Sequence, residues 1–445
     1  MPCRNVWWQR VSITIGLVCA IGSAALVVPA RADIHQRRAD AAAVADPVPY
    51  TPPSGQVFGV PAAAGGAPAQ QFVFHRAVTA SFRAAVPGST VWVSMFSWDA
   101  DRSDLQSDSI AAAKDAHLRG VNVRVLLYHK RVRNDEIRSL VATLGVDTTK
   151  RSWAKVCRGA CLGRSGSKLG VHHAKVLVFS KIATTGGMFI TDLSYVTSAN
   201  LTGSNSVDSW NNTTVIPNDP TIARAATAYL ADMAKDETDL STPPVRSGIY
   251  RIDFYPRKSL APDPAVAVLR KVGCTVKEPG YGRSQRTVVR VLMYGWKAGR
   301  VAVAKKLVAL RKAGCNVAVI VNNDPAQKSL SAKVAATLIK GKVPTWDGRR
   351  VKNRVATHYN HAKTLVINGS YDGNPTKRVY SGSSNFTVSS VTSNDETTLR
   401  TIDAATTAQT EAWFSQVKAH SKRLTKVPVT SGSPGAEDDG ELAGP

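Results

Sequence analysis

Residues 172–179, HHAKVLVF, and residues 360–367, NHAKTLVI, decide the fold of this chain. Each stretch carries a histidine and a lysine two residues apart: His173 and Lys175 in the first, His361 and Lys363 in the second. Strand side chains alternate between two faces, so each His and Lys pair lies on one face. The apolar run that follows is typical of a buried strand. Both stretches therefore predict a buried strand that presents one imidazole and one fixed cation.

A polar turn follows each of these strands at a similar distance. The first turn reads SAN at residues 198–200, and the second reads GSSN at residues 382–385. Ser198 and Asn200 thus correspond to Ser383 and Asn385. A single such turn is ordinary loop chemistry. Its recurrence in the same order after both His and Lys pairs indicates a duplicated unit.

The repeat extends into the segments that precede these strands. Residues 91–98, VWVSMFSW, resemble residues 289–296, VRVLMYGW, and residues 120–127 resemble residues 314–321. Helical patterns lie between these strands at residues 109–118 and 301–312. Strands that alternate with helices favour a mixed sheet covered by helices. We expect an α/β fold of two similar halves, each a mixed β-sheet flanked by helices, packed side by side about a pseudo-twofold axis.

Composition suggests where the parts of the chain begin and end. Pro, Ala and Gly are frequent before residue 71 and around residues 243–286, and the C-terminal end is acidic and Gly-rich. Helical patterns near residues 221–236 and 404–419 close the two halves. The expected order is a signal peptide (1–32), a disordered leader (33–70), the first half (71–242), a connector (243–286), the second half (287–425) and a disordered acidic tail (426–445).

The N-terminal segment has the pattern of a secretory signal. Arg4 and Arg10 precede an apolar run at residues 11–28, and ARA at residues 30–32 supplies small residues for cleavage. We expect cleavage near Ala32 and Asp33 and a secreted product. The alternative is a retained membrane anchor, because the run approaches the length that spans a bilayer.

Cysteine usage agrees with an oxidising compartment. Four cysteines remain beyond the signal, and we expect disulfides between Cys157 and Cys161 and between Cys274 and Cys315. Zinc binding is the weaker alternative, because the CxxxC pair has no second pair at zinc-finger spacing.

The chain has 445 residues and a formal net charge of +25. Such an excess attracts polyanions and anionic membranes, and it does not distinguish between them.

The two histidines can act on one phosphate if the halves bring them together. Lys175 and Lys363, with the amides of Asn200 and Asn385, would supply positive charge and donors to its oxygens without a metal. One imidazole can attack phosphorus and become a phosphohistidine. The other can protonate the leaving oxygen and later deprotonate water, because the pKa of an imidazole lies near neutrality.

These stretches resemble the HKD motif, His-x-Lys-x4-Asp, of the phospholipase D superfamily. The resemblance covers nearly all of residues 71–425 and implies one metal-independent phosphodiesterase site between two α/β halves. The matching residues are His173, Lys175, Ser198 and Asn200 in the first copy and His361, Lys363, Ser383 and Asn385 in the second. The motif's Asp is replaced by Ser180 and Asn368. In the family that Asp is structural, so the mechanism is less affected than the motif.

A carboxylate that orients the histidine is expected in each copy. Glu396 stands eleven residues after Asn385, where family members often place one. The first copy has Asn211 or Asn212 at that place, and Asp208 is close enough to substitute. A neighbouring carboxylate favours a protonated imidazole, so we expect His361 beside Glu396 to be the general acid. His173 would then be the nucleophile, although the reverse assignment stays open because a carboxylate can also strengthen a nucleophile.

The expected function is that of a secreted phospholipase D that hydrolyses phospholipids to phosphatidic acid and the head-group alcohol. No cofactor, metal or obligate protein partner is inferred, and the expected partner is a phospholipid or membrane surface. The first alternative is a secreted nuclease of the same superfamily, whose positive surface follows a phosphate backbone. The second is a non-catalytic binder of anionic polymers.

Overall fold

A computed structural model describes residues 46–99, 108–162, 164–165, 168–237, 242–353 and 355–428. The first half is built on a seven-stranded sheet, counted over these residues. Its strands, in spatial order, are β1 (Gly55–Phe58), β10 (Asn212–Ile216), β8 (Phe189–Thr197), β7 (Val176–Ala183), β2 (Thr90–Met95), β3 (Asn122–Tyr128) and β4 (Trp153–Cys157). β2, β3 and β4 are parallel, and the other neighbouring pairs are antiparallel.

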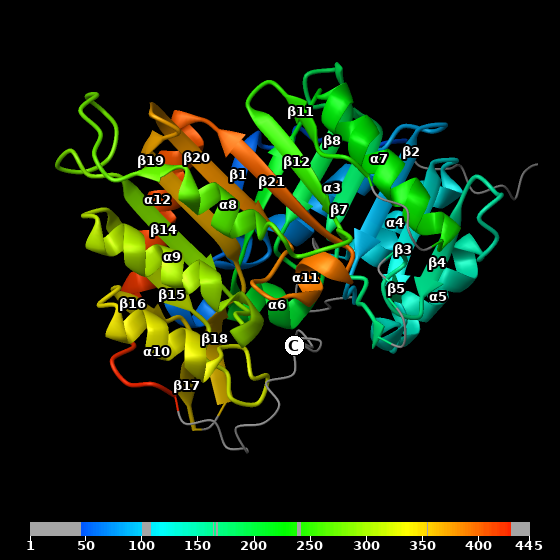
Figure 1. Cartoon of the computed structure of the whole chain (residues 1–445). Coiled ribbons are helices and arrows are strands. Elements are labelled where there is room, and N and C mark those ends of the chain that lie inside the picture. Colours follow the sequence, from blue (N-terminus) through cyan, green and yellow to red (C-terminus); the bar gives the residue numbers. More distant parts are fainter. Residues whose placement is uncertain are drawn as a thin grey trace, which may run out of the picture. The chain divides into compact units, whose positions relative to one another are not determined.

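The second half repeats this topology in a ten-stranded sheet, counted over the same residues (Figure 1). Its path is β11 (Val245–Ser247), β12 (Tyr250–Tyr255), β21 (Glu396–Ile402), β20 (Asn374–Gly382), β19 (Lys363–Tyr371), β14 (Val288–Met293), β15 (Asn316–Val321), β16 (Thr345–Asp347) and β22 (Lys422–Arg423), with β13 (Val272–Gly273) on β19. β14, β15 and β16 are parallel, as are β2, β3 and β4. β8 contacts β20 and β21, so the two sheets lie beside one another.

The apolar runs of the two motifs form the central strands β7 and β19. Each is antiparallel to the first parallel strand of its sheet, β7 to β2 and β19 to β14. Both runs are rich in Val, Ile and Leu because helices cover both faces of these strands.

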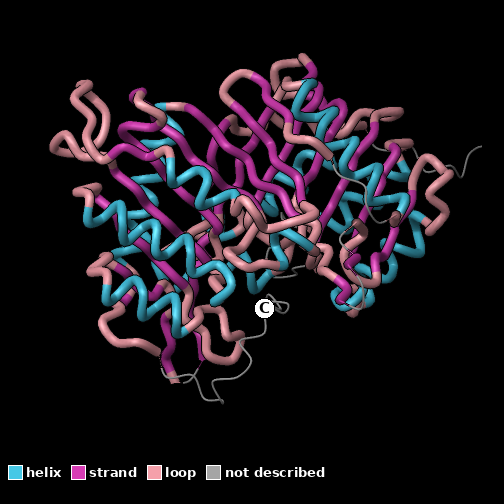
Figure 2. The backbone as a smooth tube through the Cα atoms, viewed as in Figure 1, coloured by secondary structure: helices cyan, strands magenta, loops and turns pink. Residues whose placement is uncertain are grey.

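Helices cover both faces of each sheet (Figure 2). Helices α3, α4 and α5 pack on one face of the first sheet and α7 on the other. Helices α8, α9 and α10 pack on one face of the second sheet and α12 on the other. The helices are α2 (Pro68–Gln71), α3 (Val73–Ala84), α4 (Ser109–Leu118), α5 (Asp135–Leu144), α6 (Gly203–Asp208), α7 (Pro220–Lys235), α8 (Pro264–Arg270), α9 (Val301–Lys312), α10 (Ala332–Lys340), α11 (Ser389–Thr392) and α12 (Ala404–Ala419).

Short elements complete the chain. The 3-10 turns are η1 (Ala62–Ala64), η3 (His129–Arg131) and η4 (Ala298–Arg300). The minor strands are β5 (Arg164–Ser165), β6 (Lys168–Leu169), β9 (Ser209–Trp210), β17 (Arg350–Lys352) and β18 (Val355–Asn360).

The predicted α/β architecture is confirmed, including several element bounds. Helices predicted at residues 109–118, 301–312 and 404–419 form with these limits as α4, α9 and α12. Each has a local start or stop signal. Asp108 and Asp403 accept hydrogen bonds from backbone N–H groups in the first turns of α4 and α12, and Gly314 follows α9 with a positive φ.

The prediction of a disordered leader was wrong for its C-terminal part. Residues 55–58 form β1, which pairs antiparallel with β10, and Val60 is buried. Pro and Gly are frequent here because the chain turns around a short edge strand, where Pro is tolerated. The predicted signal peptide lies outside the described residues, as does the tail beyond residue 428.

The predicted connector also forms part of the second half. It supplies β11 and β12, and β12 pairs with β21 as β1 pairs with β10. Each half therefore takes its edge strand from the segment that precedes it, and the repeat is longer than the similarity of the sequence indicated. Within the described ranges, no helix is long and apolar enough to cross a bilayer.

The two predicted disulfides are present. Cys157 is bonded to Cys161, and Cys274 is bonded to Cys315, each with an S–S distance of 2.00 Å. The second bond ties the former connector to the segment that precedes β15. All four sulfurs are thus committed to disulfides, and none is a thiolate ligand for zinc.

Candidate active site

Both motifs lie at the carboxyl ends of the central parallel strands. Ser94 near the end of β2 pairs with Val176, and Met293 at the end of β14 pairs with Lys363. Sites in α/β folds gather at this end of the strands, because the loops there converge from several elements. His173, Lys175 and His361 lie in the segments just before β7 and β19, and Lys363 is the first residue of β19. The prediction that both His and Lys pairs lie within the strands is therefore correct only for Lys363.

Each motif histidine is held by the backbone of the other half. The backbone N–H of His173 donates to the carbonyl of Asp395 at 3.1 Å, and that of His361 donates to the carbonyl of Trp210 at 3.0 Å. The second contact continues the parallel pairing of β18 with β9. The halves therefore cross at the site, and neither half completes it alone.

The partner of His173 is Glu396, which belongs to the second half. Nδ1 of His173 lies 2.9 Å from each carboxylate oxygen, and both side chains are buried. The prediction that Glu396 would stand beside His361 was wrong. The repeat located the residue correctly along the chain, but the crossing of the halves points its side chain at the histidine of the other copy.

The partner of His361 is Asn211, the counterpart of Glu396. Nδ1 of His361 lies 3.0 Å from Oδ1 of Asn211, which also accepts from the hydroxyl of Ser198 at 2.9 Å. Nδ2 of Asn211 donates to Oδ1 of Asn205 at 3.1 Å, which fixes the orientation of the amide. Nδ1 of His361 is thus the donor in its bond to Asn211.

Asp208 does not take the place of a carboxylate beside His361, contrary to the prediction. Asp208 is the last residue of α6. Burial raises the pKa of the nearby Tyr359 hydroxyl, and the charge of Asp208 raises it further. In the second copy, Ser383 hydrogen bonds to Glu396, as Ser198 bonds to Asn211. The two serines thus hold the two residues that orient the histidines.

The two motif lysines are buried and occupy equivalent positions. Lys175 donates to the carbonyl of His173 at 2.9 Å, and Lys363 donates to the carbonyl of His361. Each ammonium also lies over an aromatic ring, Lys175 over Phe96 at 5.0 Å and Lys363 over Tyr294 at 4.9 Å. Carbonyl and ring contacts partly replace the water that the ammonium groups lose.

The two asparagines differ in their bonding. Oδ1 of Asn385 accepts from the backbone N–H of Gly295 at 3.0 Å. The side-chain amide of Asn200 is buried, and among the described residues neither its oxygen nor its nitrogen has a hydrogen-bond partner. The same holds for Nε2 of His361. Buried polar groups of this kind are costly, so they mark the place where a polar ligand fits.

The electrostatics of the two histidines are coupled. Burial lowers the pKa of His173 well below its usual value, as do the charges of Lys175 and Lys363. The pKa of His361 is lowered by burial, by the same two lysines and by His173. Each imidazole is neutral near pH 7. The charges of the same two lysines, one from each motif, act on both rings, so both rings belong to one site.

The lysines and Glu396 are also perturbed by burial. The pKa of Lys175 falls to about 7 by burial, although Glu396 opposes the change. The pKa of Lys363 falls well below its usual value by burial and by the charge of Lys175. Burial raises the pKa of Glu396 to about 7, against the opposing effect of Lys175. An anion between the lysines would favour their charged forms.

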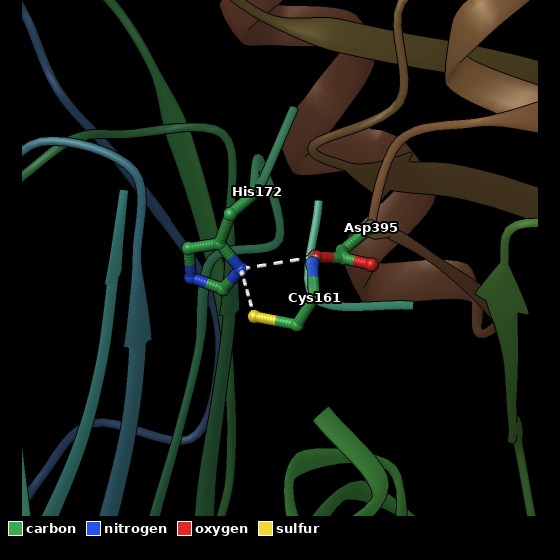
Figure 3. A group of neighbouring side chains, drawn as sticks. All are labelled: Cys161, His172 and Asp395. Carbon is green, nitrogen blue, oxygen red and sulfur yellow. Dashed lines mark hydrogen bonds and ion pairs between the residues drawn. The ribbon is translucent and has the colours of Figure 1, made fainter. Parts of the chain in front are cut away.

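His172 and Asp395, which precede His173 and Glu396 in the sequence, form a second His and carboxylate pair (Figure 3). Nδ1 of His172 is 3.2 Å from Asp395, whose carboxylate accepts from the backbone N–H groups of Cys161 and Leu162 at 2.6 and 3.0 Å. His172, Asp395 and Cys161 are close enough to hold a metal ion, but Sγ of Cys161 is bonded to Cys157. The disulfide loop thus fixes the residue that precedes Glu396.

Arg131 is a charged neighbour of the site that the sequence analysis missed. Its guanidinium lies 4.9 Å from the ring of Phe96, and its charge lowers the pKa of His173 and Lys175. The repeat gave no signal for it, because the chain after β15 has Asn and Asp instead of the His, Lys and Arg that follow β3. Its position just after a parallel strand was the available signal.

Comparison with known proteins agrees with this architecture. A family model for the cardiolipin synthase, PLD-like domain matches residues 82–234 and 283–418. No curated protein matches the sequence significantly.

Solved structures also match the chain, at low sequence identity. The phosphatidylserine synthase of Haemophilus influenzae Rd KW20 matches with a TM-score of 0.52 at 13% identity, over 80% of this chain and 86% of that one. The polyphosphate kinase of Porphyromonas gingivalis matches with a TM-score of 0.47 at 13% identity, over 81% of this chain and 50% of that one, so the chain spans half the length of the kinase. Nuc of Salmonella typhimurium, a phospholipase D family member, matches with a TM-score of 0.28 at 17% identity, over 39% of this chain and 96% of that one.

The matched ranges cover both motifs and more than half of the chain, and the duplicated sheets and paired histidines agree with them. The chain belongs to the phospholipase D superfamily of phosphodiester-acting enzymes, within the family described as the cardiolipin synthase, PLD-like domain.

Proposed function

We propose that the protein is a secreted phospholipase D that hydrolyses phospholipids to phosphatidic acid and a head-group alcohol. The observation that carries the proposal is the pairing of two buried histidines from different halves, each with a different partner, around two lysines. The two disulfides support export to an oxidising compartment.

His173 is the proposed nucleophile. Its Nδ1–H donates to Glu396, so the lone pair resides on Nε2. Nε2 attacks phosphorus, and the bond from phosphorus to the head-group oxygen breaks. The imidazole gains positive charge in this step, and the adjacent carboxylate stabilises it. The same role was predicted for His173 from the sequence, but on the expectation that Glu396 lies beside His361, whereas Glu396 contacts His173.

His361 is the proposed acid and base. In the free protein it is neutral, and the phosphate charge would raise its pKa and favour the imidazolium when substrate binds. It donates a proton to the departing alcohol and then takes one from water. The resulting hydroxide attacks the phosphohistidine, the bond from phosphorus to nitrogen breaks, and His173 is restored. Lys175, Lys363 and Asn200 donate to the phosphate oxygens throughout.

A substrate with a good leaving group separates these two roles. Bis(4-nitrophenyl) phosphate releases 4-nitrophenolate, which needs little protonation. His361→Ala should therefore release about one equivalent of nitrophenol per chain and stop as a phosphoenzyme, because no base activates water. His173→Ala should give no burst, and His117→Ala serves as a histidine control outside the site. A burst from His173→Ala that His361→Ala lacks would reverse the assignment.

A hairpin beside the site favours a lipid substrate. β18 leads directly into His361, and with β17 it forms an antiparallel hairpin. Val351 and Val355 on this hairpin are 47% and 67% exposed, and Arg350 and Lys352 are exposed beside them. Apolar side chains flanked by basic ones suit a membrane surface with anionic head groups. Release of choline or ethanolamine from vesicles in EDTA tests this reading directly.

The second candidate is a nuclease, which the net charge of +25 also suits. It predicts degradation of plasmid DNA in EDTA with steep inhibition by salt. Intact plasmid together with head-group release would remove it. A non-catalytic binder, the third reading, predicts that no phosphoenzyme can be trapped.

A further inference from the structure

A basic pocket lies on the face of the second sheet that packs against α8. Its volume is about 630 Å³, and residues of α8 form one wall. The pocket takes its floor from the face of β11, β12, β21, β20 and β19. Lys363 and Ser384 line it as well, so it extends to the site of the motifs.

Arginines form a row across the floor of this pocket. Arg246 on β11 is the direct strand partner of Arg251 on β12, and Arg251 is the direct partner of Arg400 on β21. Arg378 on β20 lines the same pocket. Like charges directly opposite one another on neighbouring strands destabilise a sheet. Such a row therefore needs compensating negative charge.

The protein supplies little of that charge. Asp253 binds Arg251 through two contacts of 2.9 Å and also binds Arg257 at 3.1 Å. The other acid of the lining, Asp372, is paired with Lys271 at 2.7 Å. Nε of Arg400 is buried and has no hydrogen-bond partner within the described part of the chain. Burial lowers the pKa of Arg400, and so do the charges of Arg378, Arg246 and Arg251.

The corresponding face of the first sheet carries apolar residues at the positions of two of these arginines. The spacing from the polar turns makes Leu193 the counterpart of Arg378 and Val215 the counterpart of Arg400. The strand pairings agree, because Val215 pairs with Tyr195 as Arg400 pairs with Tyr380. Both apolar residues are buried in the core under α3.

The helix over this face also differs between the halves. α3 has 12 residues, and Phe74, Val78 and Phe82 of that helix lie in the core with Leu193 and Val215. Its counterpart α8 has 7 residues. The shorter helix leaves part of the sheet uncovered, and arginines occupy the floor where the first half has apolar side chains. The substitution and the opening occur together, which is the pattern of a binding site.

We propose that Arg246, Arg251, Arg378 and Arg400 bind a phosphate group in this pocket, separately from the catalytic histidines. Phosphate suits the site because its oxygens accept from guanidinium forks that approach from several strands. The pocket is larger than one phosphate and is also lined by Tyr255, Tyr371 and Phe386. An organic group attached to the phosphate can pack against these rings. This inference does not depend on the proposed function.

Binding of labelled orthophosphate to the full chain by equilibrium dialysis tests the proposal. The wild type should bind phosphate at two sites, one catalytic and one in the pocket. Arg378→Gln with Arg400→Gln should weaken one class of site by at least about tenfold, because charge-assisted bonds are lost. Arg151→Gln with Arg224→Gln removes two exposed arginines elsewhere and should retain both sites. Equal binding by the two double variants would overturn the proposal.

A second measurement uses the unmodified protein, in case the pocket variant fails to fold. Phenylglyoxal modifies accessible arginines, and mass spectrometry of peptides locates the products. Orthophosphate should protect Arg378 and Arg400 several-fold and leave Arg224 unprotected, since charge-assisted contacts occlude the guanidinium groups. Equal modification with and without phosphate would contradict the proposal.

Vesicle binding identifies the source of the phosphate. Vesicles of phosphatidylcholine with and without phosphatidic acid are sedimented with the wild type and with the pocket double variant. A loss of binding to phosphatidic acid vesicles assigns the pocket to a lipid phosphate. A loss of orthophosphate binding alone assigns it to a soluble phosphate.

Discussion

Replacing Glu396 with glutamine removes one charge from the site and retains nearly the same shape. The carboxylate lies 2.9 Å from Nδ1 of His173 and is fully buried. Glutamine can still accept from Nδ1–H, so the tautomer of the imidazole is preserved. The variant therefore isolates the charge of Glu396 from its role in orienting the ring.

The magnitude follows from the charge that His173 gains when it attacks phosphorus. Two unit charges about 4 Å apart interact by about 4 kcal/mol at an effective dielectric constant of about 20. If half of the positive charge has developed in the transition state, the loss is about 2 kcal/mol. A loss of about 2 kcal/mol should slow formation of the phosphohistidine roughly 30-fold, and the full loss of about 4 kcal/mol should slow it roughly 1,000-fold.

The assay is the burst of 4-nitrophenol from bis(4-nitrophenyl) phosphate, with the phosphoenzyme trapped by rapid acid quench. The measurement belongs near pH 8, where a carboxylate with a pKa of about 7 is mostly ionised. Glu278→Gln removes an exposed carboxylate and serves as the matched control.

Two results would refute the reasoning about Glu396. A burst rate of Glu396→Gln within about threefold of the wild type would show that the charge does not act on the nucleophile. A larger effect of Asn211→Ala on the burst would indicate that His361, and not His173, attacks phosphorus.

Three further predictions concern stability and membrane binding. Because the pKa of Glu396 is raised to about 7 in the folded protein, the wild type should lose stability relative to Glu396→Gln as the pH rises from about 4.5 to 7. Urea unfolding of both proteins across that range measures this difference, and a gain of wild-type stability with rising pH would contradict the prediction. Replacing Cys274 and Cys315 by serine should cost about 4 kcal/mol, and replacing Cys157 and Cys161 about 2 kcal/mol, because the enclosed loops span 41 and 4 residues; equal losses in denaturant titrations would contradict this order. Val351→Asp with Val355→Asp should reduce head-group release from vesicles several-fold more than it reduces hydrolysis of a soluble diester. The control Val146→Asp, at a site in the first half that is 70% exposed, should change both rates alike. Equal losses of the two rates in the hairpin variant would argue against membrane insertion.

Local patterns in the sequence were sufficient for the elements of the fold. The helices at residues 301–312 and 404–419 were predicted with the bounds that they have, because their spacing, caps and stop signals are local. The strands β7 and β19 were equally clear, since helices bury both faces and leave an uninterrupted apolar run. These features depend on residues within a few positions of one another.

Features that depend on docking between segments were missed or wrong. Composition predicted a disordered leader, because the edge strand β1 is only four residues long and its sequence pattern is weak. The strand is ordered because it pairs with β10, which lies far away in the sequence. The arginine row was also invisible, because Arg251 and Arg400 are far apart in sequence and meet only through the register of β12 with β21. The local sequence of neither strand predicts that register.

The exchange of histidine partners also depends on docking between segments that are far apart in sequence, and it explains why the site is asymmetric. A repeat aligns Asn211 with Glu396, but the crossing of the halves gives Glu396 to His173 and Asn211 to His361. Two copies with identical residues would provide two equivalent histidines, each able to attack or to protonate. A single difference, carboxylate against amide, makes the rings unequal, since only His173 has a buried anion to stabilise the charge that attack creates. The different roles of the two histidines thus depend on which residue each contacts and on the half that supplies that residue.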